Sequence, residues 1–155
     1  MSDQFDFIGA TDKPALLAIS TPEWVSTAQA ALVEIGYKVH GIANHSEFPG
    51  RFSQVPYHVV ILEERFSCES PEENLVLQTM QRMPMNQRRH ATVILMGDSF
   101  ETLNALQGFK HSVHAVVNFT EMALLSQIVQ KVVADNNLFL NSYREMQQRV
   151  IQADE

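Results

Sequence analysis

Cysteine is nearly absent from this sequence of 155 residues, in which Cys68 is the only one. A single thiol excludes an internal disulfide framework and fits a reducing compartment, so we expect a cytoplasmic protein. Basic residues are also scarce, with 11 Lys and Arg against 18 Asp and Glu and a net charge of −7. This acidic balance argues against nonspecific binding to nucleic acid or to an acidic membrane surface.

Long apolar runs and glycine-rich loops are missing as well. No apolar run approaches the roughly 20 residues that a membrane-spanning helix needs. None of the predicted strands is followed by a glycine-rich phosphate loop, and the G-x-S-x-G elbow of α/β-hydrolases does not occur. His111 and His114 have no acid or cysteine close by to complete a metal site, so we interpret them as surface residues. We therefore predict no metal and no cofactor.

The clearest positive feature is the run YHVVILEE at residues 57–64. A short apolar stretch rich in β-branched residues is typical of a strand that is buried on both faces. In α/β folds, sites form where such strands end. Glu63, at the end of this run, is therefore a candidate site residue.

Strands and helices are expected to alternate along the chain. Strands are predicted at 15–19, 39–43, 57–64, 91–96 and 113–117. Helices are predicted to begin after Thr21, near residue 45, at Ser70, at Ser99 and at Thr120, the last one running to the chain end. This order indicates a three-layer α/β fold with a five-stranded parallel sheet. We expect a flexible arm over 1–13, the domain over 14–135 and a helical extension over 136–155.

The only basic cluster comprises Arg82, Arg88, Arg89 and His90. We interpret it as a solvated loop, and the alternative is a contact with a partner.

The order of the elements resembles the receiver domain of two-component response regulators, a flavodoxin-like fold of the chemotaxis-regulator type. The resemblance rests on the five βα units, on Ser-Thr-Pro-Glu at 20–23 followed by Gly36-Tyr37, and on the spacing of His58 to Glu63. It covers about residues 14–135. The family's chemistry uses two acids after the first strand to help bind Mg²⁺ and an aspartate at the end of the third strand to accept the phosphoryl group. A Ser or Thr after the fourth strand and a Lys after the fifth contact the phosphoryl oxygens.

None of these positions keeps its expected residue in this sequence. The resemblance places the acid pair on Ile19 and Ser20, the acceptor on Glu63, the hydroxyl on Met96, the lysine on Asn118 and the aromatic switch residue on Ala115. The chain therefore resembles a degenerate pseudo-receiver. Glu63 either imitates a phosphorylated aspartate or is a solvated carboxylate paired with Arg65 or a helix N-terminus.

The function predicted from this resemblance is a phosphorylation-independent signalling and protein-interaction module of a bacterial regulatory system, and not an enzyme. The alternatives are an atypical phosphoreceiver and a small-molecule-binding flavodoxin-like domain. The partner is an unidentified protein. The resemblance implies that it binds to the face formed by the fourth helix, fifth strand and fifth helix, which we expect to be fixed in one conformation.

The last predicted helix continues about twenty residues beyond the length of a receiver domain. Its apolar positions are spaced 4-3-4-3 along the sequence, as in a heptad seam. We expect the end of this helix to pair with a second copy through Asn136, Phe139, Tyr143, Met146 and Val150. The alternative is that these residues fold back onto their own domain.

Overall fold

A five-stranded parallel sheet forms the centre of the molecule. The computed structural model describes residues 8–153, and the strands lie in the order β2-β1-β3-β4-β5. Their bounds are β1 Lys13–Ala18, β2 Tyr37–Gly41, β3 Val59–Glu63, β4 Thr92–Gly97 and β5 Ala115–Asn118. The predicted fold class is confirmed. Residues 1–7 of the expected N-terminal arm lie outside the described residues, and the remainder of that arm includes a turn in which the Gly9 N–H donates to Asp12.

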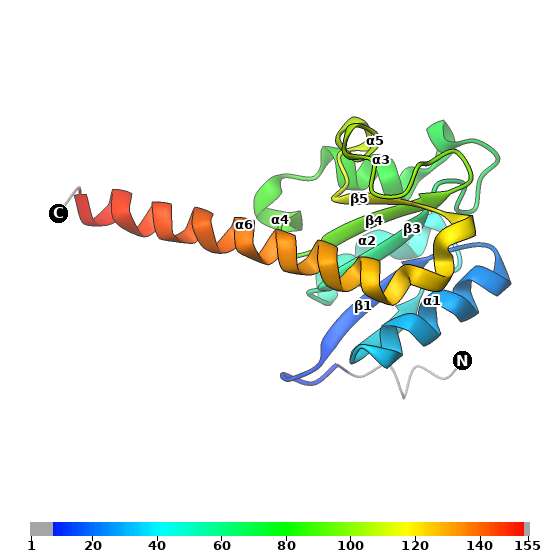
Figure 1. Cartoon of the computed structure of the whole chain (residues 1–155), viewed down its shortest axis with the longest axis horizontal. Helices are drawn as coiled ribbons and strands as arrows, with labels where there is room; N and C mark the ends of the chain where they lie inside the picture. Colours follow the sequence, from blue (N-terminus) through cyan, green and yellow to red (C-terminus); the bar gives the residue numbers. More distant parts are fainter. Residues whose placement is uncertain (1–7, 154–155) are drawn as a thin grey trace.

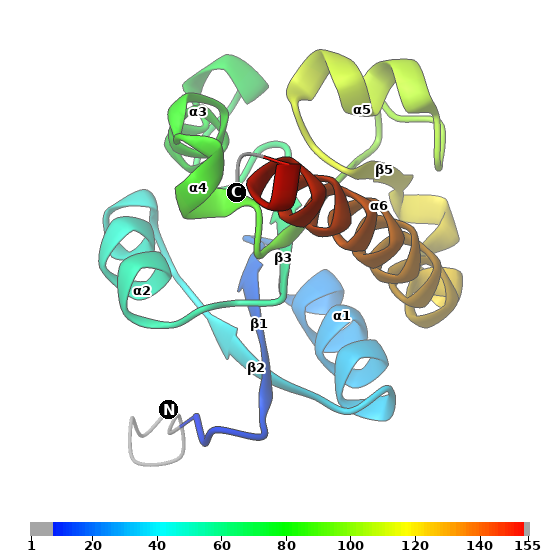
Figure 2. The same ribbon diagram turned by 90° about the vertical axis from the view of Figure 1, so that its left-hand side faces the viewer.

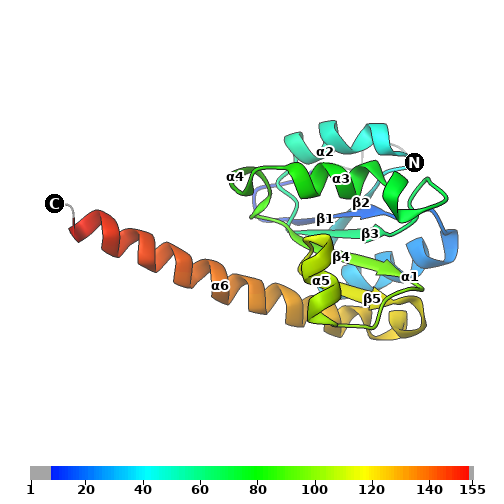
Figure 3. The ribbon, with the colours of Figure 1, turned by 90° about the horizontal axis from the view of Figure 1, so that it is seen from above.

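Helices cover both faces of this sheet. The α-helices are α1 Pro22–Glu34, α2 Phe48–Gln54, α3 Leu75–Arg82, α4 Met85–Arg88, α5 Ala105–His111 and α6 Leu125–Ala153. Short 3-10 helices occur at η2 His45–Glu47, η3 Pro71–Glu73 and η4 Phe119–Leu124. Figures 2 and 3 show α1 and α6 on one face, with α2 and α3 on the other.

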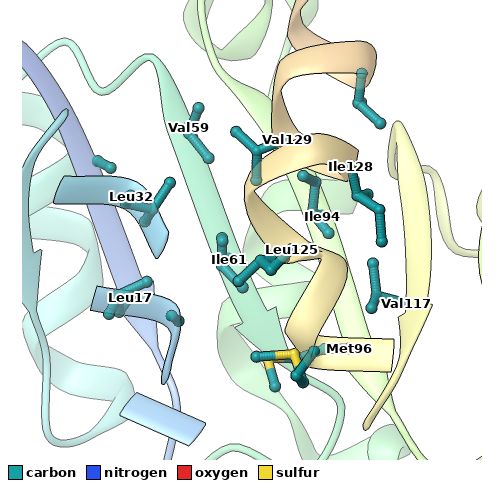
Figure 4. Close-up of a cluster of buried hydrophobic side chains, with 14 of the residues drawn as sticks. Leu17, Leu32, Val59, Ile61, Ile94, Met96, Val117, Leu125, Ile128 and Val129 are labelled. Carbon is teal, nitrogen blue, oxygen red and sulfur yellow. The ribbon is translucent and has the colours of Figure 1, made fainter. Parts of the chain in front are cut away.

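Two hydrophobic clusters hold these layers together. Strands β3 and β4 are buried along their whole length, as their continuous apolar sequences predict. Alternate residues point to opposite faces, so Ile61 and Ile94 pack under α1 and α6 while Leu62 and Leu95 pack under α2 and α3. Figure 4 shows the first cluster, where Leu125 and Val129 of α6 lie against the strands.

Asparagines begin three elements where serine or threonine was predicted to do so. The 3-10 helix η3 does begin after Ser70, but α3 begins only after Asn74, and the expected starts at Ser99 and Thr120 were wrong. The side chains of Asn74, Asn104 and Asn118 accept hydrogen bonds from the backbone N–H of Leu77, Gln107 and Thr120, respectively. The N-cap role needs only a short side chain with an acceptor oxygen, so neighbouring polar residues are not distinguished by sequence.

Arg88 corrects the interpretation of the basic cluster as a solvated loop. Its side chain is buried and donates hydrogen bonds of 2.7 Å to the carbonyl oxygens of Met80, in α3, and Ser112, after α5. Carbonyls near a helix C-terminus lack partners in the helix, and a guanidinium supplies several donors in a fixed geometry. Arg88 therefore joins the ends of two helices, while Arg82, Arg89 and His90 are exposed.

The helix α6 crosses the expected domain boundary at residue 135 without a break. It has 29 residues and is ~43 Å long at 1.5 Å per residue. Its first half packs on the sheet, and its second half projects away from the domain (Figure 1). None of the described helices is long and apolar enough to cross a bilayer.

Candidate functional site

The residues predicted from the resemblance gather at the carboxyl edge of the sheet. In the strand register, Glu63 lies beside Met96, and Gly97 lies beside Asn118. Ile19 follows the end of β1, the strand adjacent to β3. The structure therefore brings together the ends of the four strands that would form a phosphorylation pocket.

Two of these positions belong to the hydrophobic core. Met96 is fully buried and Ile19 nearly so, and both lie in the cluster under α1 and α6. Neither side chain offers an oxygen to a metal ion. Next to Ile19, the hydroxyl oxygen of Ser20 accepts a 2.7 Å hydrogen bond from the backbone N–H of Ser67. The loop after β1 is thus bonded to the loop after β3.

Glu63 is not solvated, as one of the two alternatives for this residue would require. Glu63 is 5 % exposed and Glu64 is 3 % exposed, and the Oε1 atom of each has no hydrogen-bond partner among the described residues. Arg65 does not pair with Glu63, because its guanidinium lies 4.0 Å from the Asp98 carboxylate in an exposed ion pair. Burial follows from the loops that close over the end of β3.

Asn74 supports this closed strand end. Its side chain is fully buried, and its Nδ2 donates to the carbonyl oxygens of Glu63 and Glu64 at 2.9 and 3.1 Å. Its Oδ1 accepts from the Leu77 N–H at the start of α3. One amide therefore fixes the end of β3 relative to α3.

The Glu64 carboxylate connects the end of β3 to the loop that follows β4. Its Oε2 accepts a 2.7 Å hydrogen bond from the hydroxyl of Ser99, and its backbone N–H donates to the carbonyl oxygen of Met96. The same carboxylate fills the space next to Gly97 that a side chain would otherwise occupy. Ser99 therefore anchors this loop.

Asn118 makes the most connections at this edge. Its Nδ2 donates to the carbonyl oxygen of Phe100 at 2.7 Å and to that of Asp98 at 3.4 Å. Its Oδ1 accepts from both the backbone N–H and the hydroxyl of Thr120. Its backbone N–H donates to the hydroxyl of Thr102. Asn118 thus holds the β4–α5 loop against the start of η4.

Neighbouring apolar groups pack this edge further. Phe119 stacks on Trp24 of α1, with ring centroids 5.0 Å apart and planes 4° from parallel. At the opposite end of β5, Ala115 occupies the switch position; it is buried and has no large side chain to move. Receiver domains carry a mobile aromatic ring at the position that the resemblance assigns to Ala115.

The lysine that the family uses in phosphoryl chemistry is missing from this edge, where Arg65 is paired with Asp98. Lys13 and Lys38 lie in the first half of β1 and β2, and Lys110 and Lys131 lie on α5 and α6. Phosphoryl transfer relies on positioned cations and metal ions. Within residues 8–153, no group of three or more His, Cys, Asp and Glu side chains could hold a metal ion.

Cys68 offers no reactive nucleophile in its place. Burial, followed by the negative charges of Glu73 and Glu63, raises the pKa of the Cys68 thiol. Because the thiolate is the nucleophilic form, a raised pKa lowers its reactivity. Sγ donates to the Ser70 carbonyl oxygen at 3.2 Å.

Three further residues organise this edge together with Asn118, and the sequence did not identify them. Glu64, Asn74 and Ser99 come from separate loops and match no catalytic motif. The only pattern that could have indicated them is two consecutive acids directly after a buried apolar run, since both can remain buried only if polar groups from other loops surround them.

Comparison with solved structures assigns the receiver-domain fold to this chain. A response regulator from Thermotoga maritima superposes with a TM-score of 0.63 at 14% identity, over 79% of this chain and 98% of that chain. The chemotaxis response regulator CheY4 of Vibrio cholerae gives a TM-score of 0.60 at 13% identity, over 79% of this chain and 99% of that one. A fusion that carries the yeast Spc42 trimeric coiled coil gives 0.62 at 14% identity, over 95% and 94% of the two chains. No family model and no curated protein matches the sequence.

Proposed function

We propose that this domain is a pseudo-receiver, a signalling module that binds a protein partner without accepting a phosphoryl group. At the carboxyl edge of the sheet, Glu63 occupies the position of the aspartate that accepts the phosphoryl group in receiver domains. Glutamate is one methylene longer than aspartate, and its carboxylate is buried. Ile19 and Ser20 stand where the family has the acids that help bind Mg²⁺, which prefers carboxylate oxygens in octahedral geometry.

The hydrogen bonding of Asn118 carries this proposal. An active receiver needs a flexible cation at the end of β5, whereas the Asn118 amide has both its nitrogen and its oxygen bonded to neighbouring loops. In place of a group that could reach a phosphoryl oxygen, the chain has one that fixes the β4–α5 loop. We infer that this loop keeps one conformation with no modification.

The face formed by α5, β5 and α6 is the proposed partner surface. Leu106 and Phe109 of α5 are 80 % and 85 % exposed, which is unusual for large apolar side chains on adjacent turns. Beside them, a groove of about 520 Å³ runs between α5 and α6, with Ala115 and Val132 among its lining residues. A partner with an apolar helix or loop fits this surface.

Phosphodonor treatment tests the proposal directly. The purified chain is incubated with acetyl phosphate and Mg²⁺, with an active receiver domain as the positive control, and its intact mass is measured. We expect the mass of this chain to stay unchanged while the control gains one phosphate. A stoichiometric phosphate adduct on this chain would refute the proposal.

The partner surface needs a separate measurement. Partners are captured from the native cell with the wild-type chain and with a Leu106→Ser/Phe109→Ser variant. The matched control is Val33→Ser, which removes an exposed apolar side chain from α1 on another part of the surface. We expect the double variant alone to lose the captured protein.

A further inference from the structure

The second half of α6 carries apolar side chains that nothing in its own domain covers. Asn136 still contacts the domain, since its Nδ2 donates to the Thr92 hydroxyl at 3.1 Å. Tyr143 lies under the Arg89 guanidinium, 5.6 Å from its ring centroid. Phe139, Met146 and Val150 are each more than half exposed. Tyr143 thus keeps a contact with its own domain, as the fold-back alternative expects, whereas Phe139 and Met146 remain largely exposed.

These exposed side chains continue the face by which α6 packs on the sheet. Leu125, Val129 and Val132 are buried in the core, and the 4-3 spacing continues from them through Phe139 to Val150. A heptad spacing drifts only about 20° per seven residues around a straight helix. The seam formed by Phe139, Tyr143, Met146 and Val150 therefore lies on the same side of α6 as the domain.

We propose that this seam packs against the same seam of a second copy, with the two helices antiparallel. A parallel pair would bring both domains into one space, because each domain lies on the seam side of its own helix. In an antiparallel pair the domains lie at opposite ends of the shared segment. Each helix end then points toward the base of the other domain.

The spacing of the seam is self-complementary in this orientation. Antiparallel pairing about a point between residues 144 and 145 sets Phe139 of one copy beside Val150 of the other, and Tyr143 beside Met146. The shared segment from residue 139 to 150 is ~18 Å long. All four apolar positions are then covered by apolar partners.

Charge favours the same arrangement. The C-terminal end of a helix carries a partial negative charge, and α6 is described as far as Ala153. Parallel helices would place two such ends side by side. Antiparallel helices bring each of these helix ends toward the base of the other domain, where the Arg89 guanidinium is exposed.

Sedimentation of the full chain tests whether the seam mediates association. The wild-type chain is expected to approach twice 17.5 kDa as its concentration rises. Phe139→Ser/Met146→Ser should sediment as a monomer at the same concentrations. Leu138→Ser is the matched control, because Leu138 is 67 % exposed on the same turn but lies outside the seam. A wild-type monomer throughout, or a control that dissociates like the seam variant, would overturn the proposal.

Disulfide trapping tests the orientation. In a Cys68→Ser background, Phe139→Cys and Val150→Cys chains are oxidised separately and as a mixture. The antiparallel pair predicts covalent dimers in the mixture, joined between positions 139 and 150, and few or none in either chain alone. Dimers formed by each variant alone would indicate a parallel pair and refute the antiparallel arrangement.

Discussion

The Glu64 carboxylate lies where a side chain at position 97 would have to go. A Cβ atom on Gly97, the last residue of β4, would overlap Oε1 of Glu64, the first residue after β3. Position 97 therefore favours glycine because there is no space for a side chain. The backbone conformation is not the reason, since φ of Gly97 is not positive. The close approach lets Glu64 reach Ser99 and fasten the loop after β4.

Replacing this glycine tests the close packing. Gly97→Ala should destabilise the fold by about 1–3 kcal/mol, because both strand ends are buried and have little room to move. The free energy of unfolding is measured with a chemical denaturant. Gly50→Ala is the control, since nothing lies within 4 Å of the added Cβ and its position in α2 favours alanine.

A second substitution identifies Glu64 as the cause. Glu64→Ala should be destabilising alone through loss of the Ser99 bond and of packing. In the double variant, Gly97→Ala should then add much less than it does in the wild-type background. Full additivity of the two changes would show that the clash with Glu64 is not what makes Gly97 necessary.

The Asn118 bonds make a second prediction about the same loop. Asn118→Ala removes a donor to the Phe100 carbonyl and an acceptor for the Thr120 N–H, so we expect a loss of about 1–3 kcal/mol in the free energy of unfolding. Asn137→Ala, at an exposed position of α6, should change stability by less than about 0.5 kcal/mol.

Exchange measurements separate a local effect from a global one. If Asn118 holds the β4–α5 loop, amide hydrogen exchange in Asn118→Ala should increase most over residues 98–104. The wild-type loop should show no microsecond–millisecond exchange by relaxation dispersion. Such exchange over residues 96–110 of the wild type would contradict a fixed loop.

The sheet could be predicted from sequence because its strands are local features. Short β-branched runs such as that before Glu63 indicate buried strands without knowledge of their neighbours. The helix starts were harder to predict from sequence. Ser70 and Asn74 are both suitable caps, and only tertiary contacts select Asn74 as the cap of α3. Its amide also serves Glu63 and Glu64, which the sequence places eleven and ten residues earlier.

The position of the candidate site could be predicted from sequence, but the burial and the hydrogen bonds of its residues could not. The resemblance to receiver domains put Glu63, Met96 and Asn118 at one edge of the sheet. That Glu63 is buried depends on loops whose paths no local pattern determines. Arg88 was misinterpreted for the same reason, because its acceptors lie 8 and 24 residues away and exist only in the folded chain.

The last prediction concerns pH and rests on His114. Its Nδ1 accepts a 2.9 Å hydrogen bond from the Val93 N–H, which requires that nitrogen to be unprotonated. Partial burial of the ring, followed by the nearby Arg88 guanidinium, lowers the pKa of His114 from its usual 6.5. Below pH 6.5 the unfolded chain takes up a proton that the folded chain does not yet bind. Stability should therefore fall as the pH is lowered below this value, and His114 should not affect it above.

A non-titrating variant isolates this contribution from the other histidines. Burial, as the largest cause, also lowers the pKa of His58, His90 and His111, so the wild-type curve contains all four. His114→Asn keeps an acceptor for Val93 but removes the ionisation. Thermal unfolding between pH 7.5 and 5.5 should show a smaller loss of stability for the variant than for the wild type. Parallel curves would mean that His114 binds its proton equally well in the folded and unfolded chains.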